Sequence, residues 1–181
     1  MTLLILGLLL YAGSHLFKRL APDARAAMGD KGKLLVTALS LAGVVLMVIG
    51  YRAWDSGFFW GRHPALVGIN NLLMVLAFYL FAASGTKARI TTKIRHPQLT
   101  AVKVWALGHL LVNGDVASFV LFGGLMMWAV LEVILINRNT PAWVPATTVP
   151  AGAEIKAVVA TVVVMGLVSV IHIWLGYNPF G

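Results

Sequence analysis

The sequence predicts an all-α membrane protein, a polytopic transmembrane bundle of about six helices. Two observations support this fold class. The 181 residues are 60% hydrophobic and only 11% charged, whereas soluble domains carry roughly a quarter charged residues. The chain also contains several runs of the about 20 mostly apolar residues that a helix needs to cross a bilayer. We therefore expect a single integral membrane domain over residues 1–181, with the lipid bilayer as a partner.

The expected helices are the apolar runs between clusters of turn residues. They lie at residues 2–19, 33–53, 64–84, 98–112, 115–137 and 153–176. Pro64, Pro97 and Pro150 lie at or just before helix starts, where a missing amide proton costs little. Asn113-Gly114-Asp115 predicts a tight turn whose aspartate caps the fifth helix. Residues 138–152 are rich in Pro and Thr and predict a loop.

The fourth helix is short for a transmembrane segment. From Pro97 to Val112 it rises about 24 Å at 1.5 Å per residue, less than the roughly 30 Å hydrocarbon core. We therefore expect the fourth and fifth helices to form a tight hairpin. Irregular backbone at that depth survives only when it is buried in protein or lines a polar cavity.

The basic residues predict the orientation in the membrane. Lys and Arg collect in cytoplasmic loops of membrane proteins, and here they collect in alternate connections. The expected cytoplasmic connections carry Lys18, Arg19, Arg25, Lys31, Lys33, Lys87, Arg89, Lys93, Arg95 and Arg138, whereas the opposite ones carry Arg52 and Arg62. Both termini are therefore expected on the non-cytoplasmic side. The same scatter between apolar runs argues against nucleic-acid binding despite the net charge of +8.

The chain lacks two features whose absence limits the chemistry and the processing that we expect of it. It has no cysteine, which excludes disulfides, thiolate metal sites and cysteine nucleophiles. Histidine, carboxylate and methionine remain as ligands for a metal or haem. Residues 1–17 are apolar with no positive stretch before them, so we expect a retained first helix rather than a cleaved signal.

The segment from Arg95 to Asp115 is the strongest candidate for a functional site, because ionisable residues inside a membrane are costly. Helical spacing puts Trp105, His109 and Asn113 on one face. An aromatic ring one turn before a histidine suits a flat cofactor, and neutral imidazole is a common haem ligand. The alternative is a histidine that only hydrogen-bonds a neighbouring helix.

His15 is the second candidate. Tyr11, His15 and Arg19 share one face of the first helix, so a ligand there would meet an aromatic ring, an imidazole and a guanidinium. The arginine would hold a haem propionate through charge-assisted hydrogen bonds. The alternative is an interfacial tyrosine with an arginine that snorkels to the membrane surface.

The other polar residues have more ordinary interpretations. His172, near the outer end of the sixth helix, is a reserve ligand. His96 is expected to cap a helix start, His63 to lie at the interface, and Lys103 to snorkel toward the cytoplasm. Glu132 is expected to be a buried carboxylate that needs a partner.

Three sequence motifs resemble one known family. RHPQLTAVKVWALGHLLVNGD at 95–115, GSH at 13–15 and LFGGLMMWAV at 121–130 resemble the NnrU family of bacterial membrane proteins. That family is associated with denitrification and nitric oxide metabolism. The resemblance implies a multi-pass protein of the bacterial inner membrane that acts on nitric oxide or a lipophilic small molecule.

The NnrU family is itself similar to the zeta-carotene isomerases, which use haem b with histidine axial ligands to isomerise a double bond. Their motif shares the arginine-histidine-proline-glutamine start and a histidine thirteen residues later. This similarity implies His109 and His15 as ligands of haem b, with His96 as a functional histidine nearby. The role would be isomerisation of a lipophilic substrate, or redox or nitric oxide sensing. The predicted topology puts His15 near the cytoplasm and His109 about 18 Å from the start of its helix, so His172 stays open as the second ligand.

Two other functions remain open. Arg95-His96-Pro97 also resembles the helix start of membrane methyltransferases that use S-adenosylmethionine. Those enzymes carry paired glutamates after the next helix, whereas this chain has only Glu132 there. The remaining alternative is a non-catalytic assembly partner of a denitrification enzyme, in which the histidines only pack helices.

Overall fold

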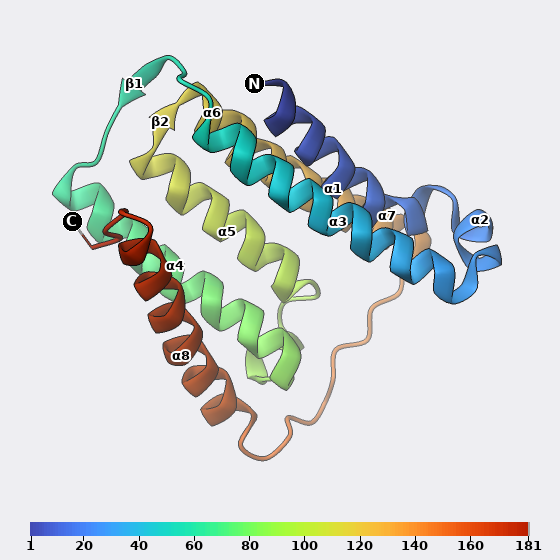
Figure 1. Cartoon of the computed structure of the whole chain (residues 1–181). Coiled ribbons are helices and arrows are strands. Elements are labelled where there is room, and N and C mark those ends of the chain that lie inside the picture. Colours follow the sequence, from blue (N-terminus) through green and yellow to red (C-terminus); the bar gives the residue numbers. More distant parts are fainter. Residues whose placement is uncertain (181) are drawn as a thin grey trace. The chain divides into compact units, whose positions relative to one another are not determined.

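The computed structural model describes residues 1–180 and is mostly helical (Figure 1). In chain order the elements are α1 (Thr2–Leu20), α2 (Pro22–Ala27), α3 (Gly29–Arg52), β1 (Phe58–Trp60), α4 (Pro64–Thr86), η1 (Arg89–Thr92), α5 (Pro97–Val112), β2 (Gly114–Asp115), α6 (Val116–Ser118), η2 (Phe119–Gly123), α7 (Gly124–Asn139) and α8 (Ala153–Trp174). They form two compact units. The first contains Met1–Phe59 and Gly114–Pro141, and the second contains the other described residues.

The predicted all-α membrane fold is confirmed. Five helical segments are long and apolar enough to cross a membrane, with α6, η2 and α7 counted as one segment, Val116–Asn139. The sixth long helix, α5, has 16 residues. Many large apolar side chains face outward, for example Leu72 at 73% and Val162 at 67% exposed. Such a surface suits lipid tails rather than water.

The structure differs from the sequence prediction at several element boundaries. The second long helix begins at Gly29 rather than at 33, and the short helix α2 precedes it. The predicted turn at 113–115 contains a strand, because Gly114–Asp115 pairs with β1. The loop after α7 begins at Thr140 rather than at 138. Helix ends are uncertain by about one or two residues, whereas the strand at Gly114–Asp115 depends on pairing with the distant β1.

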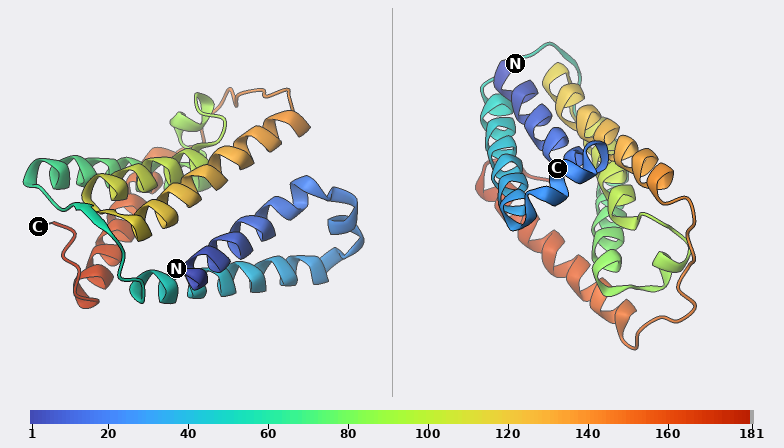
Figure 2. Two further views of the ribbon diagram at one scale, coloured as in Figure 1. Left: turned by 90° about the horizontal axis from the view of Figure 1, so that it is seen from above. Right: turned by 90° about the vertical axis from the view of Figure 1, so that its right-hand side faces the viewer.

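In the first unit, α1 and α3 lie side by side and antiparallel (Figure 1). Glycine makes this close approach possible, because a Cβ on Gly7 would lie 2.6 Å from the Gly43 carbonyl oxygen. The hydroxyls of Ser14 and Ser40 also bond across the two helices at 2.9 Å. The helix α7 packs against α1 and runs in the same direction (Figure 2).

Asp115 holds the start of the 116–139 helix. Its carboxylate accepts from the Ser118 amide at 2.8 Å and from the Ser118 hydroxyl at 2.7 Å. The Ser118 hydroxyl lies 2.8 Å from the Tyr51 hydroxyl at the end of α3. The predicted cap is confirmed, and it also ties the end of α3 to this helix.

In the second unit, α5 packs antiparallel against α4, and α8 also packs against α4 (Figure 1). Gly108 of α5 faces Asn70 and Met74, because a Cβ there would lie 2.9 Å from Asn70 Oδ1. Glu154, in the first turn of α8, accepts from the Tyr79 hydroxyl at 2.9 Å and from the Arg89 amide. This carboxylate therefore fixes the start of α8 to the end of α4.

Candidate functional site

His15 lies in an aromatic cluster between α1 and α7 of the first unit. Its ring centroid is 4.3 Å from that of Tyr11 and 5.2 Å from that of Trp128. Its Nδ1 is 2.9 Å from the Tyr11 carbonyl oxygen. A carbonyl can only accept, so Nδ1 carries the proton and Nε2 holds the lone pair. In this tautomer, Nε2 is the ring nitrogen that could ligate a metal.

One turn further along α1, Arg19 pairs with Glu132. Arg19 Nε lies 3.4 Å from Glu132 Oε2, and the carboxylate side chain is 8% exposed. The expectation that Glu132 is buried and needs a partner is confirmed. The guanidinium that we expected at a haem propionate therefore also neutralises a buried carboxylate of its own chain.

Trp128 of α7 has an unpaired polar atom next to His15. The residue is 7% exposed, and its Nε1 has no hydrogen-bond partner among residues 1–180. Buried donors are nearly always paired in folded proteins. This indole therefore offers a donor for an acceptor that the described chain does not supply.

His109 lies on α5 in the second unit, on the face that the sequence predicts. The rings of Trp105 and His109 are 4.9 Å apart. His109 Nδ1 donates to the Trp105 carbonyl oxygen at 3.1 Å, and Asn113 Nδ2 donates to the His109 carbonyl oxygen at 2.9 Å. Nε2 is again the unprotonated nitrogen.

His172 of α8 shares the second unit with His109. Its Nδ1 donates to the Val168 carbonyl oxygen at 2.8 Å, so it has the same tautomer as the other two histidines. His15, in contrast, belongs to the first unit.

The other two histidines lie at helix starts. His63 caps α4, and its Nδ1 accepts from the Ala65 amide at 3.3 Å. His96 occupies the N-cap position of α5, directly before Pro97. Among residues 1–180, no group of three or more His, Asp or Glu side chains is placed to hold a metal ion.

Sequence reasoning did not single out Trp128 or Asn70. Asn70 is 6% exposed, and its Oδ1 has no hydrogen-bond partner among the described residues. The sequence itself contains a feature that marks each of these two positions. Trp128 belongs to the motif at 121–130, and Asn70-Asn71 interrupts the apolar run of α4. Their positions, however, depend on which helices pack together.

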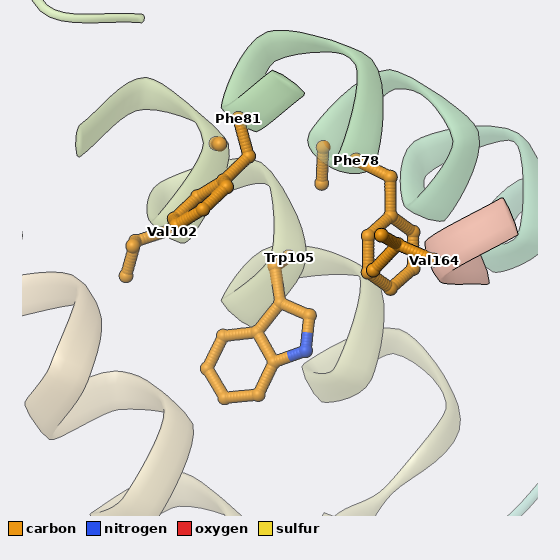
Figure 3. Close-up of a pocket in the computed structure, with 7 residues that line it drawn as sticks. Phe78, Phe81, Val102, Trp105 and Val164 are labelled. Carbon is orange, nitrogen blue, oxygen red and sulfur yellow. The ribbon is translucent and has the colours of Figure 1, made fainter. Parts of the chain in front are cut away.

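An apolar pocket lies beside Trp105 in the second unit (Figure 3). Its volume is about 260 Å³, and it is lined by Ala77, Phe78, Phe81, Ala101, Val102, Trp105 and Val164. These residues come from α4, α5 and α8. The indole that packs on His109 is therefore also a wall of this pocket.

The comparisons with known proteins give one match. No curated protein and no solved structure matches the chain. The family model described as "NnrU protein" matches residues 3–179 of the 181 residues. The chain therefore belongs to the NnrU family.

Proposed function

We propose that this NnrU protein binds haem b in the bacterial inner membrane, and that the imidazoles of His15 and His109 would hold it. The supporting observation is the tautomer that these histidines share. Each donates Nδ1–H to the carbonyl four residues earlier on its own helix. Histidines that bind metals nearly always donate their other ring nitrogen in this way, which fixes the ring and makes Nε2 the ligand.

The surroundings of both histidines fit a flat, apolar cofactor with charged edges. Each imidazole packs against an aromatic ring one turn earlier, Tyr11 for His15 and Trp105 for His109. Arg19 offers a guanidinium for a propionate, and the Trp128 indole offers a buried donor. His172 has the same tautomer and remains the reserve ligand.

The role that we propose is either nitric oxide chemistry in support of denitrification or isomerisation of a lipophilic substrate. Haem iron, when bound, would supply a redox centre, and it would offer a coordination site to a small ligand only if one of its two imidazoles left. The residues of the chain hold and orient it. The imidazoles ligate, the aromatic rings exclude water, and Arg19 neutralises negative charge.

Single histidine variants test this assignment. Protein from haem-replete cells should show a Soret band, which His109→Ala and His15→Ala should each weaken or shift. His63→Ala is the matched control, because that histidine caps a helix. A shift in His172→Ala together with no change in His15→Ala would overturn the ligand pair. Wild-type spectra in all four variants would support the assembly-partner alternative instead.

A further inference from the structure

We infer that the apolar pocket of the second unit binds the hydrocarbon chain of an uncharged lipophilic molecule. Phe78 and Phe81 of α4, Trp105 of α5 and Val164 of α8 surround the space from several directions (Figure 3). The site thus lies inside one compact unit and needs no other part of the chain.

The lining determines the chemistry of the occupant. All seven lining residues are apolar, and the volume is about 260 Å³. A buried water needs two to four polar partners, whereas an apolar cavity of about 150 Å³ stays dry and binds benzene. The apolar lining of this pocket therefore suits an apolar chain rather than water, an ion or a polar head group.

The concave shape offers an occupant more contact than the outward faces of the helices offer bulk membrane lipid. Ala77 and Ala101 are 5% and 3% exposed, so small, buried residues make room between three aromatic rings. On outward faces such as that of Val162, which is 67% exposed, a lipid tail gains contact on one side only. A chain in the pocket gains dispersion contacts on several sides at once.

The pocket is coupled to the candidate haem ligand through one side chain. Trp105 lines the pocket and its ring lies 4.9 Å from the His109 ring. A bound chain would therefore touch the same indole that packs on the imidazole. This inference supplies a place for the lipophilic substrate in the proposed function, but it does not require haem, so the two can fail separately.

Photolabelling of the full-length protein tests the inference. The protein, prepared without haem, is placed in phospholipid nanodiscs with a long-chain alcohol that carries a diazirine. Labelling should concentrate on the α4 and α5 residues of the pocket. Ala101→Phe should reduce it about tenfold, the change expected for roughly 1.4 kcal/mol of lost binding free energy. Val162→Phe, on an outward face, should leave it unchanged.

A second variant keeps the inference testable if Ala101→Phe does not fold. Val164→Trp narrows the pocket from a position that is 43% exposed, and it should reduce the labelling while the helical circular dichroism stays the same. Label spread over the outward faces of α4 and α8, and unchanged by either pocket variant, would overturn the inference. That result would mean that the chain contacts only bulk lipid.

Discussion

At the level of single residues, the contacts within one helix were predictable and the contacts between helices were not. Helical spacing alone predicts that Trp105 packs on His109 and Tyr11 on His15, because residues four apart share a face. The packing of Trp128 on His15 depends on α1 and α7 being neighbours. The sequence predicts that Glu132 needs a partner, but not that the partner is Arg19.

The Arg19–Glu132 pair gives a prediction about stability. In haem-free protein, Arg19→Met should lower the free energy of unfolding by about 1–3 kcal/mol, because it leaves a buried carboxylate unpaired. The loss should be smaller than for a fully buried pair, since the Arg19 side chain is 30% exposed. Denaturant titration in detergent measures it.

Lys18→Met is the matched control, because Lys18 is an exposed cation on the same helix. The double variant with Glu132→Leu should recover most of the loss, since it removes the orphaned charge along with its partner. Equal stability of Arg19→Met and Lys18→Met would show that the ion pair contributes nothing.

At the level of elements, helices were predictable and the close approaches between them were not. Apolar runs identify the five spanning segments, because a membrane helix needs about 20 mostly apolar residues. The strand at Gly114–Asp115 escaped prediction because its partner, β1, lies far away in the sequence. Gly7 and Gly13 look alike in the sequence of α1, yet only Gly7 meets the backbone of α3.

Substitution of these two glycines tests the α1–α3 interface. Gly7→Ala should destabilise the protein by about 1–3 kcal/mol, the usual effect of overpacking, because its Cβ would lie 2.6 Å from both Gly43 O and Met47 N. Gly13→Ala should be neutral or slightly stabilising, since no atom beyond its chain neighbours and its own helix backbone lies within 4 Å of its Cβ and alanine favours helix more than glycine does. Thermal unfolding in detergent compares the two variants, and equal midpoints would argue against this close packing.

At the level of the whole molecule, the membrane topology depends on the short helix α5. The distribution of basic residues predicts six crossings, with both termini on the non-cytoplasmic side. Five segments satisfy the length and composition of a membrane span, and α5 has 16 residues. If α5 did not cross, the termini would lie on opposite sides.

Reporter fusions at each terminus test whether both termini lie on the non-cytoplasmic side of the membrane. Alkaline phosphatase is active only outside the cytoplasm, so it should be active at the N-terminus and at the C-terminus in separate fusions. Fusions after Lys18 and after Arg138 are the cytoplasmic controls and should be inactive. Activity at one terminus only would contradict six crossings and would make α5 a re-entrant helix.

The absorption spectrum of the purified wild-type protein, oxidised and then reduced, tests haem binding most directly. Protein from haem-replete cells should show a Soret band that sharpens and shifts on reduction, with the resolved visible bands of a six-coordinate iron held by two imidazoles. A protein that is folded by circular dichroism, yet has no Soret band in either state, would contradict the proposal that His15 and His109 ligate haem.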